Sequence, residues 1–205
     1  MTEQRTEAWH AEKLGNLSAS RVYDIIPGSR GAYPAAREHL LYELLAERIT
    51  GTRVEKYVTA AMQWGIDMEP VARDTYSLGM GVDVEETGFH LHPKIPRLGA
   101  SPDGLVPDNG LVEIKCPSTS NTLKLWAGED IDPRYNFQMQ TQMSVTGREW
   151  CDFVSFDLRL PRPLDLFVKR IKRDRFVIEL IEHEARKFLE ELHNLEKTIL
   201  EKMNG

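Results

Sequence analysis

Helix-type and strand-type spacing of apolar residues alternate along this chain, and no feature of the sequence restricts the fold more. Over 37–50 apolar residues recur every three or four positions, as on one face of a helix. From 82 to 115 apolar and polar residues alternate, as in strands with one buried face. Helical spacing returns over 132–146 and 174–203, with strand-like segments between. This order predicts an α+β or mixed α/β fold.

Glycine and proline positions divide these stretches into elements. In order, we expect a helix over 18–26 after a serine cap, helices over 37–50 and 56–78, strand segments within 82–93, a hairpin of 98–107 and 111–117, a helix over 132–146, strands over 150–158 and 163–172, and an amphipathic helix over 174–203. Pro70 fits the first turn of a second helix better than the interior of one. No repeat or linker interrupts the sequence, so one domain over 1–205 is expected.

The composition fits a soluble globular domain, with 41% hydrophobic and 28% charged residues. The first residues lack the basic and apolar segments of a secretory signal, and no apolar run is long enough to span a bilayer. A cytoplasmic protein with no membrane partner is therefore expected. Cys116 and Cys151 lie far apart and outside any CxxC spacing, which predicts two reduced, packed thiols and argues against a disulfide framework or a thiolate zinc site.

The net charge of −6 argues against a generic nucleic-acid binder, because counterion release from phosphates requires clustered lysines and arginines. The basic residues are nevertheless unevenly spread. The densest group lies within 169–175, and smaller groups include Arg21 with Arg30 and Lys94 with Arg97. Such groups are more often solvated faces of helices and strands than binding sites. Composition therefore leaves a local basic surface open without predicting one.

The segment from Ser101 to Lys115 has the strongest chemical pattern. Alternate residues of a strand share a face, so Glu113 and Lys115 project the same way, while Ile114 points to the core and its carbonyl lies at the edge of the site. If the hairpin pairs as expected, Asp103 lies beside them. Two converging carboxylates repel each other near a core unless a cation lies between them, and hard oxygen ligands select Mg²⁺, with Mn²⁺ as a substitute.

A metal site of this kind suits phosphodiester hydrolysis. The cation would polarise the phosphorus, lower the pKa of a bound water and stabilise the leaving 3′ oxygen. Lys115 would orient or deprotonate the attacking water, or offset developing charge. The alternative is a surface hairpin on which Glu113 and Lys115 are merely solvated, and an isolated Glu-x-Lys triplet would favour that alternative. The preceding Pro-Asp and the apolar neighbours make a fuller pattern here.

Five motifs occur in order along most of the chain: Trp9-His10 with Leu14-Gly15 and Ser18-Ala19-Ser20; Trp64-Gly65 with Glu69; Ser101-Pro102-Asp103-Gly104-Leu105; Glu113-Ile114-Lys115-Cys116-Pro117; and Gln138-Met139-Gln140. Each is weak alone. Together they resemble the lambda-exonuclease-like, or YqaJ-type, viral recombinases of the PD-(D/E)xK nuclease superfamily. The resemblance implies a restriction-endonuclease-like core, in which helices flank a central mixed sheet.

The same resemblance implies roles for the residues of the hairpin. Asp103, Glu113 and the carbonyl oxygen of Ile114 would bind the metal, and Lys115 would be the catalytic lysine.

Further roles implied by the resemblance lie outside the hairpin. Glu69 would be an outer acidic residue, and Gln140 a helix-borne glutamine beside the site. Ser20, with Lys13 or Arg30, would bind the 5′ phosphate of the DNA. Two positions depart from the family, because Lys13 stands where an arginine is expected and the residue after Glu69 is a proline.

The activity implied is a 5′ to 3′ exonuclease on double-stranded DNA that leaves a 3′ single strand for a single-strand annealing protein. The resemblance also implies a homotrimeric ring with duplex DNA in its channel. Only the channel lining need then be basic, which would reconcile the acidic total with DNA binding. The alternatives are a structure-specific or restriction-type endonuclease of the same superfamily, and a noncatalytic DNA-end module. Paired carboxylates that face phosphates argue against the noncatalytic module, because a domain that only binds DNA has no use for them.

Other candidates have simpler explanations. His90 and His92 would share a strand face and could ligate a transition metal, but no third ligand has matching spacing, so an exposed strand face is preferred. Trp126 could act as a wedge between bases, although scattered tryptophans are more often packing residues. No Gly-rich phosphate loop or GKS/T element occurs, which argues against ATP-driven movement.

Overall fold

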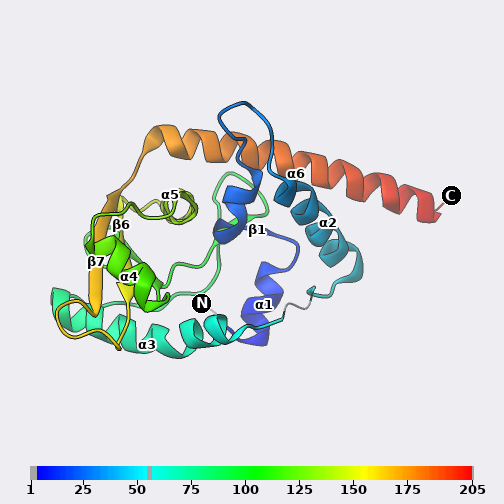
Figure 1. Cartoon of the computed structure of the whole chain (residues 1–205). Coiled ribbons are helices and arrows are strands. Elements are labelled where there is room, and N and C mark those ends of the chain that lie inside the picture. The colour runs from blue at the N-terminus through cyan, green and yellow to red at the C-terminus, as the bar shows by residue number, and fades with distance from the viewer. Residues whose placement is uncertain (1–3, 55–56, 205) are drawn as a thin grey trace.

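The computed structural model describes residues 4–54 and 57–204. The helices are α1 (Glu7–Lys13), the 3₁₀ helix η1 (Ala19–Ile25), α2 (Ala35–Thr50), α3 (Ala60–Met80), α4 (Thr119–Trp126), α5 (Pro133–Thr146) and α6 (Arg175–Asn204). The strands are β1 (Leu17–Ser18), β2 (His90–Leu91), β3 (Leu98–Ala100), β4 (Gly104–Val106), β5 (Gly110–Lys115), β6 (Trp150–Phe156) and β7 (Leu166–Lys172). In Figure 1 the strands β6 and β7 lie at the left beside α3, α4 and α5, while α1 and α2 lie at the right. The mixed α/β class expected from the sequence is confirmed.

The larger sheet has the strand order β4-β5-β6-β7 within the described residues. Strands β4 and β5 are antiparallel, β5 and β6 are parallel with Glu113 opposite Phe153, and β6 and β7 are antiparallel. Helices α4 and α5 make the crossover that a parallel pair requires. The central mixed sheet flanked by helices is therefore as expected.

Helices α3 and α5 cover opposite faces of β5. Val112 and Ile114 pack in one cluster with Tyr76 of α3, whereas Leu111 packs in another with Met139 of α5. Because alternate residues of a strand share a face, the odd-numbered residues that follow Leu111 also point toward α5. The alternation seen in the sequence thus decides which side chains of β5 meet α5.

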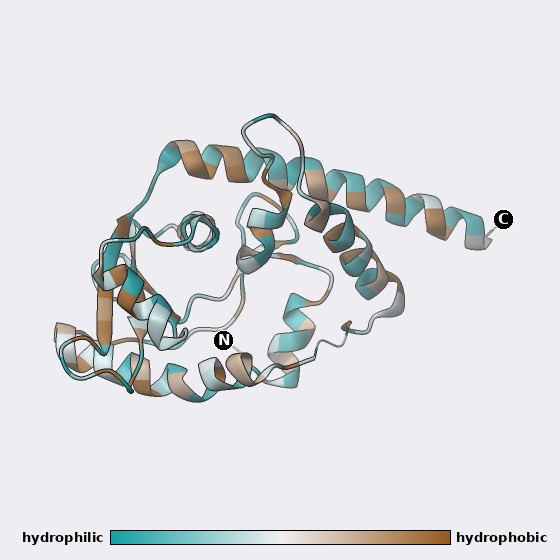
Figure 2. Ribbon diagram, viewed as in Figure 1, coloured by the Kyte–Doolittle hydropathy of each residue, from teal (hydrophilic) through white to brown (hydrophobic). Residues whose placement is uncertain are grey.

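A second part of the core lies between α2, α6 and η1, where Leu44, Ile181 and Phe188 are buried together. Bands of brown and teal alternate along α6 in Figure 2, as expected for an amphipathic helix. In the smaller sheet, β1 pairs in parallel with β3, with Leu17 opposite Leu98. Since β1 leads into η1 and β3 leads into the segment before β4, this pairing brings the serine-rich N-terminal segment beside the start of the hairpin.

Pro70 lies inside α3, which runs as one helix rather than as two that abut at the proline. A proline has no N–H for the carbonyl four residues earlier, so the Ile66 carbonyl is left for another donor. Arg5 provides that donor, with Nη1 3.4 Å from the Ile66 oxygen. The first residue of the helix expected over 56–78 lies outside the described residues.

The structure differs from the expected elements in other places. Residues 82–89 form no regular strand, although Glu85 makes an isolated bridge with Leu105. The segment expected as a helix over 18–26 is a 3₁₀ helix preceded by a short strand, and α1 and α4 were not expected. No helix in the described part of the chain is long and apolar enough to cross a membrane.

Candidate active site

The β4–β5 hairpin forms but is shorter than expected, because 98–100 of the expected strand 98–107 pair with β1 and β2 in the smaller sheet and only Gly104–Val106 pair with β5. In the connection between the two strands Asp108 and Asn109 have positive φ values of 57° and 62°, a left-handed conformation that these residue types tolerate in turns. The hairpin brings Asp103, just before β4, beside Ile114 of β5. The backbone N–H of Ile114 donates to Oδ2 of Asp103 over 2.7 Å. In a strand the N–H and carbonyl of one residue point to the same side, so the Ile114 carbonyl also faces Asp103.

Glu113 is fully buried, and side-chain donors surround its carboxylate. Lys115 donates to Oε1, Gln138 donates to Oε1 over 2.6 Å, and Gln142 donates to Oε2 over 2.6 Å. Bonds to an ionised acceptor are among the stronger hydrogen bonds in proteins. A charge in a fully buried position needs such partners, because an unpaired one is costly to desolvate.

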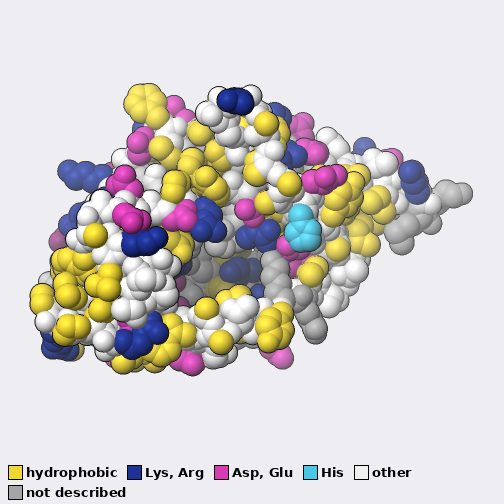
Figure 3. Space-filling view, in the orientation of Figure 1, with side chains coloured by type: hydrophobic (Ala, Val, Ile, Leu, Met, Phe, Trp, Pro, Cys, Tyr) yellow, Lys and Arg dark blue, Asp and Glu magenta, His cyan; other side chains and the backbone are white. Residues whose placement is uncertain are grey.

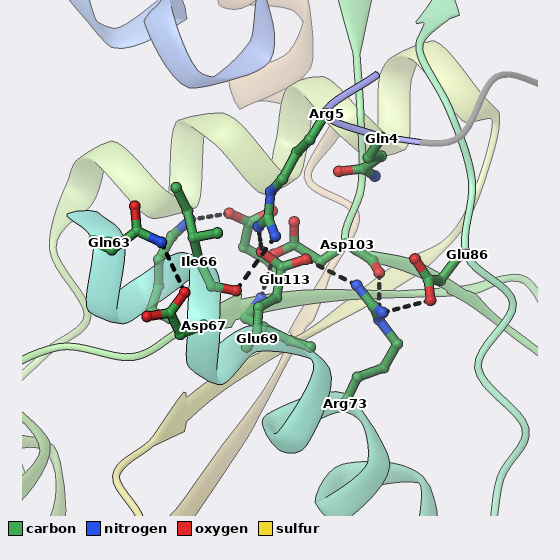
Figure 4. A network of polar contacts seen from close by, with 12 residues as sticks. Gln4, Arg5, Gln63, Ile66, Asp67, Glu69, Arg73, Glu86, Asp103 and Glu113 are labelled. Carbon is green, nitrogen blue, oxygen red and sulfur yellow. Dashed lines mark hydrogen bonds and ion pairs between the residues drawn. The ribbon is translucent and has the colours of Figure 1, made fainter. Parts of the chain in front are cut away.

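Glu69 of α3 is held by two arginines (Figure 4). Arg5 donates to Oε2 of Glu69, and Arg73 donates to Oε1 over 2.8 Å. Arg73 also donates through Nε to the backbone oxygen of Asp103 over 3.1 Å and pairs with Glu86 over 2.7 Å. Arg73 therefore connects Glu69, the expected outer acidic residue, to the segment that carries Asp103.

The carboxylates leave excess negative charge at the site. Burial and then repulsion by Glu113 raise the pKa of Asp103 well above its usual value. Burial alone would lower the pKa of Lys115, but the charges of Glu113 and Asp103 outweigh burial and raise this pKa. Burial, followed by the charges of Glu69 and Asp103, raises the pKa of Cys116 to about 12. A cation bound here would relieve the repulsion that these shifts record.

A cavity of about 200 Å³ joins the acidic site to the N-terminal segment. Its lining includes Asp103 and Glu69 on one side and Lys13 and Ser20 on the other. In the face shown in Figure 3, Lys and Arg side chains lie within a central hollow of the surface. Whereas Lys115 lines a separate cavity of about 410 Å³ together with Tyr135 and Phe153, the structure brings Asp103 and Glu69 to one cavity with Lys13 and Ser20.

Arg30 does not share this cavity. It is exposed in the loop between η1 and α2 and is absent from the lining of both this cavity and its neighbour. The neighbouring cavity, of about 160 Å³, is lined by Ser20 and Lys13 together with Arg21 and Arg53. Lys13 lies over the ring of Trp9, with Nζ 3.9 Å from the ring centroid.

Gln140 is directed away from the site, which corrects its expected place beside the metal. Its Nε2 donates to the Lys172 carbonyl over 2.9 Å, and its Oε1 accepts from the Asp174 N–H over 2.8 Å. In a helix, residues four apart share a face and residues two apart do not, so Gln138 and Gln142 face Glu113 while Gln140 faces the opposite way. The i, i+4 spacing of these two glutamines was the signal in the sequence that could have identified them.

The donors at this site fit Mg²⁺ or Mn²⁺. Among the described residues no three His, Cys, Asp or Glu side chains gather as a metal-binding group. The oxygen donors that the hairpin brings together are Asp103 and the carbonyl of Ile114, with Glu113 on the same strand. Mg²⁺ is commonly bound by one or two carboxylates, with water and substrate phosphate completing its shell. Gln142 has a buried Oε1 with no hydrogen-bond partner, an acceptor suited to a water of that shell.

The weaker candidates have structural partners. The prediction of an exposed strand face for His90 and His92 is wrong, because β2 ends at Leu91 and His92 is buried. His92 accepts the N–H groups of Lys94 and Ile95 at Nδ1 and pairs through Nε2 with Ser144, while the Nε2 of His90 contacts the hydroxyl of Thr87. The indole of Trp126 donates to the Leu164 carbonyl over 3.0 Å. Both cysteines are free thiols, as expected.

Comparisons with known proteins agree with this geometry. Residues 8–149 match the family described as the YqaJ-like viral recombinase domain. The crystal structure of LHK-Exo, an alkaline exonuclease from Laribacter hongkongensis, is 44% identical over 97% of this chain and 98% of that chain, with a TM-score of 0.90. The same values hold for LHK-Exo in complex with dAMP. A phage related exonuclease from Haemophilus somnus 129PT shares the fold at 16% identity, with a TM-score of 0.65 over 92% of this chain and 96% of that chain. A comparison with curated proteins gave no match.

Proposed function

Because the chain belongs to the YqaJ-like viral recombinase family, we propose that it degrades one strand of double-stranded DNA from its 5′ end and leaves a 3′ overhang for recombination by strand annealing. The family and the 44% identical alkaline exonuclease support a DNA exonuclease. The observation that carries the finer proposal is the shared cavity, in which Ser20 and Lys13 line the same space as Asp103 and Glu69.

The chemistry assigned to the acidic side of the cavity is metal-dependent hydrolysis. Asp103, Glu113 and the Ile114 carbonyl would hold Mg²⁺, which supplies a Lewis acid for the phosphate and an activated water. The raised pKa of Lys115 keeps its ammonium charged, so the lysine is suited to orient the water and to offset charge on the phosphate. Gln138 and Gln142 hold the Glu113 carboxylate in place by their hydrogen bonds.

The proposed 5′ to 3′ direction is supported by the other residues that line the cavity. A hydroxyl and an ammonium group, from Ser20 and Lys13, are suited to a terminal phosphate, and the relative LHK-Exo has been crystallised with dAMP, a nucleotide that carries one. Fixing the 5′ phosphate there would place the next phosphodiester toward Asp103. An end without that phosphate would be positioned less well, so its first nucleotide would be released more slowly.

A homotrimeric ring around duplex DNA and a single-strand annealing protein as partner are part of the same proposal. The net charge of −6 favours an arrangement in which an acidic exterior repels DNA and only the inner lining attracts it. Analytical ultracentrifugation with and without a short duplex tests the trimer directly.

The activity test uses a linear duplex labelled at both ends, with a 5′ phosphate or a 5′ hydroxyl, in Mg²⁺, Mn²⁺ or EDTA, and a closed circular duplex as control. Release of 5′ nucleotides only with metal, faster from the phosphorylated end and with the circle intact, is the expected result. Cutting of the circle would favour the endonuclease alternative, and no cutting in any metal would favour the noncatalytic module. Lys115→Ala is expected to retain end binding while losing cleavage.

A further inference from the structure

Arg5 extends from the N-terminal segment into the acidic site, and its guanidinium lies among the carboxylates in Figure 4. It pairs with Glu69 through Nη2 and contacts the Ile66 carbonyl through Nη1 at 3.4 Å. Arg5 lines the same cavity as Asp103. A cationic side chain therefore lies in the space to which the acidic residues attract cations.

The partners of Arg5 are arranged for it by the sequence of α3. Pro70 removes the N–H that would otherwise bond the Ile66 carbonyl, and Glu69 immediately precedes this proline. A single turn of α3 thus presents one carboxylate and one unused backbone carbonyl on the same side. Both accept hydrogen bonds from one guanidinium, which is a donor with several N–H groups in fixed geometry.

The backbone around Arg5 is fixed as well. Gln4 donates to the carbonyls of Thr87 and Pro102, each over 2.8 Å, which holds the segment against the chain next to Asp103. Arg5 itself has a positive φ of 68°, a conformation that is uncommon for residues other than glycine. The hydroxyl of Thr6 then caps α1 by accepting from the Trp9 N–H. Because the chain is held in place on both sides of Arg5, the position of the Arg5 side chain is a specific feature of the fold.

We propose that Arg5 is an internal counter-ion of the acidic site, which neutralises Glu69 and so lessens its repulsion of Asp103 in the metal-free protein, and that it competes with the divalent cation for this negative charge. This inference rests on the metal site of the proposed function. A metal ion entering between Asp103 and Glu113 meets the positive charge of Arg5, so binding is weaker until the guanidinium moves toward solvent, to which its side chain is 39% exposed. DNA phosphates arriving at the site provide an alternative partner for the released arginine.

The inference is tested by isothermal titration of the DNA-free protein with Mn²⁺. Arg5→Gln keeps hydrogen-bonding capacity and removes the charge, and it is expected to bind Mn²⁺ on the order of tenfold more tightly than the wild type, which corresponds to about 1.4 kcal/mol. Arg5→Lys keeps the charge and should stay near the wild-type affinity. Arg175→Gln removes the same charge from the exposed start of α6 and should change little.

Equal or weaker Mn²⁺ affinity in Arg5→Gln would overturn the inference. Asp103→Asn identifies the site, because titration heat that survives in this variant comes from elsewhere. If neither the wild type nor Arg5→Gln binds Mn²⁺ in an Asp103-dependent way, the metal site of the proposed function fails and the inference fails with it. If both bind equally tightly, only the inference fails.

Thermal melting gives a second measurement that does not depend on activity. In EDTA, Arg5→Gln should melt below the wild type because Glu69 loses one of its two arginine partners. Saturating Mn²⁺ should narrow or reverse this difference in melting temperature, since the bound metal then supplies the positive charge that Arg5→Gln removes. A purely structural role for Arg5 would leave the same difference in melting temperature with and without Mn²⁺, and that result would also overturn the proposal.

Discussion

Alanine substitutions at Gln138 and Gln140 should have opposite effects on activity and stability, although the two residues are neighbours on α5. Gln138 lines the active-site cavity and donates to Glu113 over 2.6 Å. Gln140 is 1% exposed and bonds only backbone groups among its described contacts, at Lys172 and Asp174. We expect Gln138→Ala to impair cleavage in a stable protein and Gln140→Ala to destabilise a protein with a normal site.

The magnitudes follow from the partners that each substitution leaves behind. Gln140→Ala removes two partly buried hydrogen bonds, to the Lys172 carbonyl and from the Asp174 N–H, at roughly 0.5–1.5 kcal/mol each. For a chain of this length one kcal/mol shifts the melting temperature by roughly 2–4 °C, so a fall of about 2–12 °C is expected. Gln138→Ala opens onto the cavity, where water can replace the lost donor, so its stability cost should stay below about 1 kcal/mol. Loss of a group that orients a metal ligand typically costs about 10–100-fold in activity or metal affinity.

The assay pairs a melting curve with the initial rate of 5′-nucleotide release, measured well below both melting temperatures. The corrected glutamine assignment requires the rate to fall in Gln138→Ala and the melting temperature to fall in Gln140→Ala. The reverse pattern would refute the reasoning and restore Gln140 to the active site. Gln142→Ala serves as an internal comparison, since it donates to the other oxygen of Glu113 and is fully buried, so both measurements should fall.

Two further predictions follow from the pKa shifts. Burial and then the charges of Glu69 and Asp103 raise the pKa of the Cys116 thiol to about 12. A bound cation offsets the contribution of the two charges, so adding Mg²⁺ should speed alkylation of Cys116 by iodoacetamide while the buried Cys151 stays unreactive. An unchanged alkylation rate with Mg²⁺ would contradict this prediction. The pKa of Asp103 is raised in the folded, metal-free protein. Between the usual aspartate pKa and this raised value, the folded protein therefore keeps a proton that the unfolded chain has released. The free energy of unfolding should fall as the pH rises through this range. Urea unfolding across pH should show this fall in EDTA, a smaller fall in Mg²⁺ and none attributable to this site in Asp103→Asn.

The hairpin could be predicted because every local signal pointed the same way. Alternation of apolar residues defined the strand, and the Asp108-Asn109-Gly110 segment has the residues that tolerate the left-handed backbone of a tight turn. Once the hairpin was fixed, the relation between Asp103 and Ile114 followed from the pairing. The family recognised from the ordered motifs is likewise confirmed by the match over residues 8–149.

Elements that depend on distant partners could not be predicted in this way. Local rules place Pro70 at the start of a helix, but α3 continues through it because Arg5, 61 residues from Ile66 in sequence, contacts the free carbonyl. Residues 82–89 alternate like a strand but contribute only one bridge, between Glu85 and Leu105, on the edge of β4 that does not face β5. Alternation in the sequence is therefore not sufficient to predict that a segment joins the sheet.

The basic run over 169–175 shows why charge in a sequence is a poor guide to a DNA surface. Arg170 pairs with the buried carboxylate of Asp152 over 2.8 Å, and its guanidinium lies 3.5 Å from the ring centroid of Trp150. Arg173 donates to the Arg148 carbonyl over 3.1 Å. Charges compensated in this way release few counterions on meeting phosphates. We therefore assign DNA affinity to the cavity, where a terminal phosphate would meet Lys13 and Ser20, and expect substitutions in the basic run to act mainly on stability.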